Sequence, residues 1–286
     1  MMYKGGIRVD GQLNFLLRNA ELDVVEFDVH QRKEMKTFNR TLPYYVMSYH
    51  KKGSAKLRVG NQIHTITPGT VIYIPPNVEH DHYKDSHEET EFLWWHFTFQ
   101  IVNVMDVMKL FQIPIAFRLH NSEYFEQVFE QFITSTSRSS SLPSSILKQA
   151  KALELLYIIL DSALGKRDHI SFNTQSLSFL DLLSRIVQHP EEQISLQSLS
   201  EEMHMHPTYI CNRFKELFGK SPMQVQREIK MQKAKKLLES SEMTITELSQ
   251  ALGFSEVQNF TRLFKTYVGV SPTQYRNLNI KWRFIK

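Results

Sequence analysis

The sequence predicts a two-domain α+β protein, in which an N-terminal antiparallel β-barrel and its following helices precede an all-α domain. Three observations lead to this fold class. Residues from about 20 to 100 form short apolar runs separated by turn residues, residues 121–166 carry apolar residues at helical spacing, and a short phrase occurs twice in the last third of the chain. The all-α domain is expected to hold two helix-turn-helix units joined by a linker helix.

The composition is that of an ordinary globular protein. Of 286 residues, 42% are hydrophobic and 22% are charged, which is enough for about two cores. The first residues, MMYKGGIRVDGQLNF, contain no apolar signal segment, and the most apolar run, LELLYIIL, is too short to span a membrane. The single cysteine, Cys211, excludes an internal disulfide. We therefore expect a cytoplasmic protein that is not associated with a membrane.

The excess positive charge lies in the C-terminal part of the chain. Residues 176–286 contain 15 Lys and Arg against 11 Asp and Glu, whereas the first 175 residues contain 19 of each kind. A basic half joined to a neutral half favours a polyanionic partner, of which nucleic acid is the commonest. A solvated helix face is the alternative explanation of a charge run.

Turn residues divide the predicted barrel, residues 1–120, into strands. Gly53, Gly60-Asn61, Pro68-Gly69 and Pro75-Pro76 separate the runs at about eight to ten residues, which is typical of an antiparallel sandwich or barrel. The runs are YYVMSY, AKLRV, IHTIT, TVIYIPP and FLWWHFTF. In the last run Trp94 and His96 share one face of an alternating strand, so Trp95 points the other way.

Residues 121–166 are predicted to form helices. Apolar residues recur at helical spacing in residues 124–133 and again in residues 147–164, and the polar stretch STSRSSSLPSS separates the two. The second stripe consists of Leu147, Ala150, Leu153, Leu156, Tyr157, Leu160 and Leu164. Such a stripe is either core or the seam with a partner helix, and residues 167–176 follow as a polar linker.

The repeated phrase indicates two helix-turn-helix units within residues 177–286. RFKELFGKSP, residues 213–222, and LFKTYVGVSP, residues 263–272, share Phe, Lys, Gly, Ser and Pro at the same offsets. Gly253 suits the left-handed turn between two helices, and Pro207 suits a first helical turn. Ser255 is expected to cap the last reading helix, with Glu256 in its first turn. A helical spacer of about 25 Å, residues 222–238, would place both units on successive major-groove segments.

The second helix of each unit has an apolar and a polar face. Ile210 and Phe214, and later Phe260 and Phe264, recur at helical spacing and point inward. The opposite faces carry side chains that read base edges or hold phosphates. The expected DNA-contacting residues are Thr208, Cys211, Asn212, Lys215, Glu256, Gln258, Thr261, Arg262 and Lys265, together with Lys230 and Arg276. A helical repeat that binds protein is the alternative.

The second unit resembles the signature of the AraC/XylS family of bacterial transcription regulators. The matching residues are Ile245-x-x-Leu248-Ser249-x-x-Leu252-Gly253-Phe254-Ser255 and Phe260-x-Arg262-x-Phe264-Lys265-x-x-x-Gly269-x-Ser271-Pro272-x-x-Tyr275-Arg276. Asn259, Val225-Gln226, Lys230 and His206 depart from the family's usual Tyr, Tyr-Leu, Arg and Ser cap, and His206 is expected to cap the first unit more weakly. The resemblance implies a homodimer, joined along residues 147–164, that binds double-stranded promoter DNA and recruits RNA polymerase.

The stretch PGTVIYIPPNVEHDHY, residues 68–83, resembles the second motif of cupin barrels, with Asn77 in place of Gly. Many regulators similar to AraC bind a ligand in such a barrel. By position, the resemblance implies a sugar pocket formed by Arg40, His80, His82, Trp94 and His96. Guanidinium and imidazole groups suit hydroxyls, and an indole face suits a pyranose.

A metal site is not expected in this cupin-like barrel. The first cupin motif, which supplies most metal ligands, should fall near residues 49–60, and this stretch offers only His50. We therefore predict no metal, no cofactor and no catalytic residue. These features predict a transcription activator that responds to a small molecule, with a sugar or sugar derivative as the leading class.

Two other functions stay open at this point. One is a cupin metal enzyme fused to a DNA-targeting module, with ligands among His80, His82, His87 and His96. The other is a ligand-independent regulator whose barrel serves only for dimerisation.

Overall fold

The computed structural model describes residues 14, 17–137, 141–164 and 174–283. Contacts divide the chain into two compact units. The sheet unit combines residues 22–99 with the segment that runs from residue 111 through a pair of helices, and the helical unit combines residues 100–110 with the helices from residue 174 onward. Residues 167–173 of the predicted linker lie outside the described residues, and residues 174–176 already belong to a helix.

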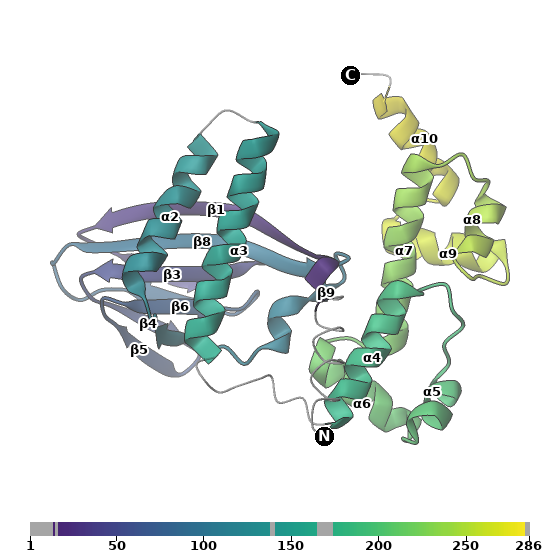
Figure 1. Cartoon of the computed structure of the whole chain (residues 1–286), viewed down its shortest axis with the longest axis horizontal. Helices are drawn as coiled ribbons and strands as arrows, with labels where there is room; N and C mark the ends of the chain where they lie inside the picture. Colours follow the sequence, from purple (N-terminus) through teal and green to yellow (C-terminus); the bar gives the residue numbers. More distant parts are fainter. Residues whose placement is uncertain (1–13, 15–16, 138–140, 165–173, 284–286) are drawn as a thin grey trace, which may run out of the picture. The chain divides into compact units, whose positions relative to one another are not determined.

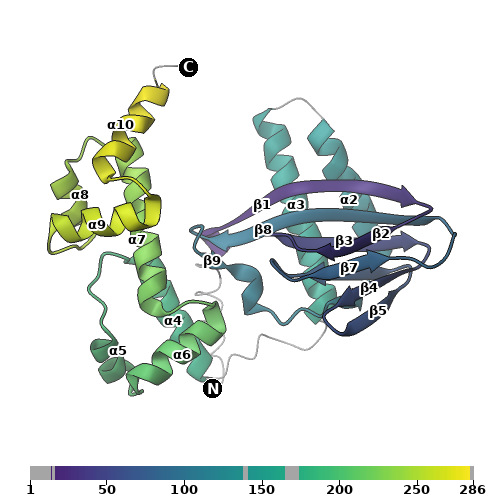
Figure 2. The same ribbon diagram turned by 180° about the vertical axis from the view of Figure 1, so that it is seen from behind.

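The N-terminal strands form two antiparallel sheets, as the turn spacing predicts (Figures 1 and 2). The larger sheet has the order β1-β8-β3-β6-β10, with β9 paired to β8, and the smaller has the order β2-β7-β4-β5. The bounds are β1 Ala20–Arg32, β2 Lys36–Arg40, β3 Tyr45–Lys52, β4 Ala55–Val59, β5 Gln62–Ile66, β6 Thr70–Ile74, β7 His80–Tyr83, β8 Thr90–Ile101, β9 Met105–Asp106 and β10 Ala116–Arg118, with the short helix η1 at Val107–Leu110. Sequence analysis missed β1, β2 and β7 because charged and polar residues interrupt or replace their apolar runs.

Apolar side chains from both sheets meet between them. Leu57 and Ile66 of the smaller sheet are fully buried, and Ile72 and Ile74 of the larger sheet are at most 2% exposed. β6, TVIYI, is buried along its whole length. Continuous burial accounts for its unbroken apolar run, because both of its faces are covered.

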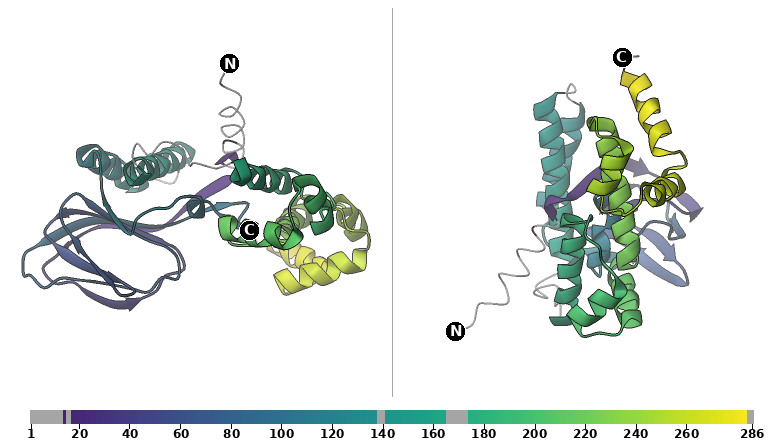
Figure 3. Two further views of the ribbon diagram at one scale, coloured as in Figure 1. Left: turned by 90° about the horizontal axis from the view of Figure 1, so that it is seen from below. Right: turned by 90° about the vertical axis from the view of Figure 1, so that its right-hand side faces the viewer.

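Helices α2 (Ser122–Ser137) and α3 (Leu142–Leu164) cover the outer face of the larger sheet (Figures 1 and 3). Trp95 is 1% exposed, and its ring centroid lies 6.2 Å from that of Phe132 on α2. Tyr49 contacts Phe125 on the same helix, with the ring centroids 5.2 Å apart. The predicted opposition of Trp95 and Trp94 is therefore confirmed.

Helix α3 has two apolar faces, and the predicted stripe includes residues from both. One face is buried against the rest of the sheet unit and carries Leu155, Leu156, Ile158 and Ile159. The other face is exposed and carries Leu142, Ile146, Leu153 and Tyr157. The placement of Leu156 on one stripe with Leu153 and Tyr157 was wrong, because this side chain is only 3% exposed and belongs to the core.

The helical unit contains two helix-turn-helix motifs joined by a long helix (Figure 1). α5 (Leu196–Met203) and α6 (Pro207–Phe218) form the first motif, and α8 (Ile245–Ala251) and α9 (Val257–Val268) form the second. α7 (Pro222–Ser240) joins them, α4 (Thr174–Gln188) packs against α7, and α10 (Pro272–Arg283) follows. The 19 residues of α7 span about 28 Å. Phe214, Phe260 and Phe264 are fully buried, which confirms the predicted inward faces.

The repeated Gly-x-Ser-Pro phrase ends one helix and begins the next. Gly219 closes α6 with a φ of 81°, a left-handed conformation that suits glycine. Ser221 then caps α7: its Oγ accepts from the backbone N–H of Gln224 at 3.4 Å, while Gln224 Oε1 accepts from the backbone N–H of Ser221 at 3.0 Å. Gly269, Ser271 and Gln274 repeat this arrangement between α9 and α10.

The loop between α4 and α5 ties the long helix to the second motif. Gln226 of α7 is 6% exposed and donates to the carbonyl oxygens of Pro190 at 3.0 Å and Glu192 at 2.7 Å. Gln193 of the same loop donates to the carbonyl oxygen of Gly253, in the turn between α8 and α9. These bonds hold the turn of the second motif in place relative to α7.

Of the two proposed reading helices, α6 begins as the sequence predicts and α9 does not. His206 does cap α6, because its Nδ1 accepts from the backbone N–H of Thr208 at 3.3 Å. The prediction that Ser255 caps α9 was wrong. The turn of the second motif is one residue longer than that of the first. Glu256 therefore occupies the N-cap position of α9, and its side chain makes no capping hydrogen bond.

Candidate functional sites

The polar faces of α6 and α9 are open to solvent. On α9, Gln258, Arg262 and Lys265 are exposed and Thr261 is half-buried. On α6, Thr208, Asn212 and Lys215 are exposed and Cys211 is half-buried. Guanidinium, amide and ammonium groups on one face of a helix are able to contact base edges and phosphates in a groove.

A surface chain of side chains positions Arg262. Glu256 Oε2 accepts from Asn259 Nδ2 at 3.1 Å, and Asn259 Oδ1 accepts from Arg262 Nη2 at 3.5 Å. Asn259 was absent from the predicted DNA-contacting set. The spacing of three residues between members of this chain, which puts them on one side of a helix, could have indicated it.

Lys230 and Arg276 do not belong to the exposed surface. Lys230 is 7% exposed, and its Nζ lies 5.0 Å from the centroid of the Phe254 ring. Burial lowers the pKa of Lys230. The Nε and Nη2 atoms of Arg276 are also buried. α7 turns Lys230 toward the second motif, and Arg276 is half-buried, so the structure does not support the prediction that these two residues contact DNA.

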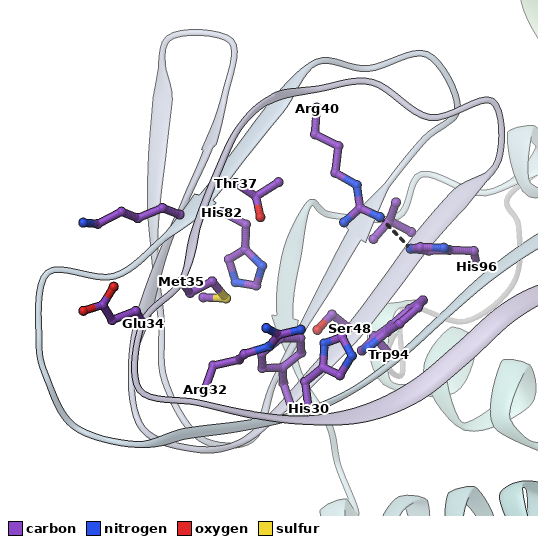
Figure 4. Close-up of a pocket in the computed structure, with 13 residues that line it drawn as sticks. His30, Arg32, Glu34, Met35, Thr37, Arg40, Ser48, His82, Trp94 and His96 are labelled. Carbon is purple, nitrogen blue, oxygen red and sulfur yellow. Dashed lines mark hydrogen bonds between the residues drawn. The ribbon is translucent and has the colours of Figure 1, made fainter.

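A cavity of about 340 Å³ lies between the two sheets of the sheet unit (Figure 4). Four of the five predicted ligand-binding residues line it: Arg40, His82, Trp94 and His96. His80 is not among the lining residues, because it is 2% exposed and its Nδ1 donates to the carbonyl oxygen of Val78 at 3.0 Å. The lining residues that sequence analysis missed are His30, Arg32, Glu34, Met35, Lys36, Thr37, Val46, Ser48 and Phe92. Most of these come from β1, β2 and the segment between them.

A β-bulge aims Arg40 into the cavity. The pairing of β2 with β7 shifts register between Thr37 and Arg40, and Asn39 has a φ of 51° there. The carboxylate of Asp81 holds this conformation, since its Oδ1 accepts from the backbone N–H of Asn39 at 2.8 Å and its Oδ2 accepts from Arg58 Nε at 2.5 Å. Both oxygens of Asp81 are therefore engaged away from the Arg40 guanidinium.

His96 is the side-chain partner of Arg40. Arg40 Nη2 donates to His96 Nε2 at 3.4 Å. A guanidinium cannot accept, so the ring proton of His96 resides on Nδ1, which faces Glu26 Oε2 at 3.4 Å. Burial and, after it, the charge of Arg40 lower the pKa of His96 to about 4. His96 is therefore neutral near pH 7 and leaves the charge of Arg40 uncompensated.

A second pair of imidazoles lies beside the cavity. His50 and His82 have their Nε2 atoms 3.2 Å apart, so one ring donates to the other. Burial lowers the pKa of His50 to about 4, and burial together with the neighbouring His50 lowers the pKa of His82 to about 3. Both rings are neutral at pH 7.

Three buried polar atoms of the lining residues make no hydrogen bond within the described chain. They are the Nδ1 of His96, which faces Glu26, the Oγ of Ser48, a residue that is 4% exposed, and the Nε1 of Trp94. Ser48 on β3 pairs directly with Trp94 on β8, so the two atoms belong to neighbouring positions. A buried hydroxyl and indole N–H without partners cost stability unless another molecule satisfies them.

Within the described residues, no group of three or more His, Cys, Asp or Glu side chains is arranged to hold a metal ion. His87, one of the histidines considered as a ligand, is exposed. None of the helices in the described part of the chain is long and apolar enough to cross a membrane.

Comparisons with known proteins match both parts of the chain. A family model described as an AraC-like ligand binding domain matches residues 28–156, and one described as a helix-turn-helix domain matches residues 199–278. The uncharacterized HTH-type transcriptional regulator YisR of Bacillus subtilis is 23% identical over 84% of this chain and 88% of its own. The HTH-type transcriptional activator RhaS of Escherichia coli is 22% identical over 75% of this chain and 78% of its own. Among solved structures, apo ToxT from Vibrio cholerae aligns with a TM-score of 0.36 at 14% identity, covering 90% and 97% of the two chains.

Proposed function

Since the chain belongs to the AraC/XylS family of transcription regulators and carries its ligand-binding domain, we propose that it activates transcription from promoter DNA in response to a small molecule. The exposed polar faces of α6 and α9 support this proposal most, because one continuous helix, α7, joins the motifs that present them. Reading helices that are separated by about one turn of DNA can enter successive major-groove segments, and α7 spans about 28 Å between the two motifs. Binding beside a promoter then recruits RNA polymerase.

Reading by α9 depends on Arg262, Gln258 and Lys265. A guanidinium donates two hydrogen bonds to guanine, an amide pairs with adenine, and an ammonium holds a phosphate. Asn259 and Glu256 keep Arg262 in one orientation and so reduce the conformational entropy lost on binding. Helix α6 contributes a second set of DNA contacts, from Thr208, Cys211, Asn212 and Lys215.

Gel-shift and footprinting assays with duplexes from upstream of the protein's own gene and its neighbours test DNA binding. We expect protection of a site that extends over two successive major-groove segments, and affinity that falls steeply with salt. A duplex of the same length and composition but shuffled sequence is the control. Equal binding to the native and shuffled duplexes would contradict the proposal.

We propose that the protein acts as a homodimer joined along the exposed face of α3. Leu142, Ile146, Leu153 and Tyr157 are 75%, 61%, 44% and 64% exposed and recur at spacings of four, seven and four residues. These spacings place the four side chains on one face of the helix, where a partner helix is able to cover them. Ile146→Glu should convert dimers to monomers in sedimentation equilibrium, whereas Ser145→Glu, an exposed position beside this face, should leave the dimer intact.

We propose the cavity of the sheet unit as the effector site, with a carbohydrate as the ligand class. Its volume of about 340 Å³ suits one small ring, and its wall combines aromatic faces with polar groups that point inward. A ligand at 100 times its Kd stabilises the folded state by about 2.7 kcal/mol, so a thermal-shift screen of small metabolites detects it. Loss of the shift in Trp94→Ala would locate the ligand, and no shift across the screen would favour a regulator that needs no ligand.

A further inference from the structure

The cavity holds a cation that the protein itself does not neutralise. Among the described residues, no carboxylate forms an ion pair with Arg40, whose side-chain hydrogen bond goes to the neutral ring of His96 at 3.4 Å. The neighbouring carboxylate, Asp81, binds Arg58 and the backbone of Asn39 with its two oxygens. A half-buried guanidinium beside neutral imidazoles is costly unless an anion reaches it.

Two other arginines of the chain, unlike Arg40, pair with carboxylates. Arg58 pairs with Glu79 and Asp81, and Arg185 pairs with Glu192 and Glu202. Arg40 lacks such a carboxylate although the bulge at Asn39 directs it inward, toward the space that a ligand would fill (Figure 4). The surrounding strands therefore fix the orientation of Arg40, whereas its charge is available to an anion that is not part of the chain.

The rest of the cavity wall adds to the positive charge. Arg32 and Lys36 line the cavity with exposed side chains, against the one lining carboxylate, Glu34. With Arg40 the lining has three cationic groups and one anionic group, so the field inside favours an anion.

The opposite part of the cavity favours hydroxyl groups and a ring. Ser48 Oγ and Trp94 Nε1 are buried and unpartnered, and they come from directly paired positions of β3 and β8. The rings of His30 and Trp94 lie 5.3 Å apart, and those of His30 and Phe92 lie 5.5 Å apart. A hydroxylated ring stacked on these faces could satisfy both orphaned atoms.

Accepting the proposed effector site, we propose that the effector is a sugar acid: a hydroxylated ring that carries one carboxylate. The carboxylate binds Arg40, which is able to donate two parallel hydrogen bonds to it. The ring hydroxyls bind Ser48 and the indole N–H of Trp94. A neutral sugar of the same size would leave the guanidinium unpaired.

Matched pairs of ligands test this inference on the full chain. D-galacturonate and D-glucuronate are compared with D-galactose and D-glucose, from which they differ by the carboxylate, and with the 6-phosphates of the two hexoses. Isothermal titration and thermal unfolding should show Kd values at least about tenfold lower for a uronate than for its neutral partner. Preference for the neutral sugars, or for the phosphates, would overturn the inference.

Variants of Arg40 identify the group that holds the charge. Arg40→Met should weaken uronate binding roughly 10- to 200-fold, and Arg40→Lys should weaken it less, because a lysine keeps the charge but not the paired donors. Lys33→Met removes a charge from an exposed position between β1 and β2 that does not line the cavity, and it should bind like the parent. Thermal unfolding without ligand confirms that the sheet unit of each variant is folded.

A smaller anion tests the role of Arg40 without a choice of sugar ring. Acetate, titrated against chloride at equal ionic strength, should shift the Nε–H resonance of Arg40, and the shift should disappear in Arg40→Met. If neither acetate nor any uronate affects Arg40, the inference is wrong. Sequence-specific DNA binding would still stand in that case, so failure of the inference is distinguishable from failure of the proposed regulator.

Discussion

The caps and the polar helix faces of the helical unit are held by contacts between residues close in sequence, whereas the polar contacts around the cavity of the sheet unit join strands far apart in the chain. Ser221 with Gln224, Ser271 with Gln274, and Asn259 with Glu256 and Arg262 are all three residues apart. Arg40 and His96 are 56 residues apart, and His50 and His82 are 32 apart.

The two units also differ in where their unsatisfied polar atoms lie. Glycines and Ser–Gln pairs close the helix ends around the two motifs. Within the described residues, both units keep buried polar atoms without partners, among them those of Ser249 and Arg276 in the helical unit and of Ser48 and Trp94 in the sheet unit. Ser48 and Trp94 both line the cavity.

The largest effect is expected at Gly253, where the helical unit depends on a contact distant in sequence. Gly253 has a φ of 72°, and a Cβ there would lie 1.9 Å from the carbonyl oxygen of Glu191. Gly253→Ala should lower the free energy of unfolding by about 4 kcal/mol, because both strain and a clash with backbone arise. Gly269→Ala, with a φ of 88° and open space around it, should cost only about 1 kcal/mol. Denaturant unfolding followed by circular dichroism measures both, and equal losses would refute this account of Gly253.

Acid should destabilise the sheet unit through its buried histidines. An imidazole in the unfolded chain binds a proton near pH 6.5, whereas the pKa of His50 in the folded protein is lowered to about 4 by burial. The unfolded state therefore binds more protons between these values, and stability is lost as the pH falls from 6.5 to 4, by about 3 kcal/mol for His50.

His50→Phe tests that assignment. The ring of His50 stacks on Phe92 with an interplanar angle of 14°, so a phenyl ring fits the same place. Urea unfolding at pH 7 and pH 4.5 should show a smaller acid loss in the variant than in the parent. An unchanged acid loss would mean that other groups cause it.

The reading faces should separate specificity from general affinity. Arg262→Ala should weaken binding to the promoter site by roughly 1–3 kcal/mol and relax the base preference at one position. Lys265→Ala should weaken binding to all DNA sequences alike. It should also reduce the slope of the logarithm of the binding constant against the logarithm of the salt concentration by about one. Lys52→Ala, at an exposed position of the sheet unit, is the charge-matched control. Fluorescence anisotropy at several salt concentrations distinguishes the three, and parental behaviour of Arg262→Ala would remove α9 as the reading helix.

The smallest effect is expected at the repeated caps. Ser221→Ala and Ser271→Ala each remove one hydroxyl that accepts from a backbone N–H three residues later. Each substitution should lower the free energy of unfolding by about 1 kcal/mol, and the two losses should be equal because the two caps have the same arrangement. Thermal unfolding of both variants checks this. A clearly larger loss of stability at one site would show that the repeated Gly-x-Ser-Pro phrase stabilises the two motifs to different extents.

Sequence reasoning predicted the exposed polar faces of α6 and α9, because helical spacing assigns faces locally. The reading of DNA by these faces stays a prediction. Sequence reasoning misplaced Lys230, whose burial depends on Phe254 in a different helix, and it missed Asn259. In the sheet unit it found Arg40, His82, Trp94 and His96 by resemblance but not Ser48 or His30. Those residues belong to the cavity only because strands β1, β3 and β8 are neighbours.

The sequence by itself determined the two helix-turn-helix motifs, their turns and their polar faces, because helix periodicity, glycine conformations and Ser–Gln caps act within a few residues. Only the tertiary structure decided which side chains surround the cavity and that no carboxylate among the described residues forms an ion pair with Arg40. Strand pairing brings together residues that no local pattern relates, and burial then determines their charge and their unmet hydrogen bonds.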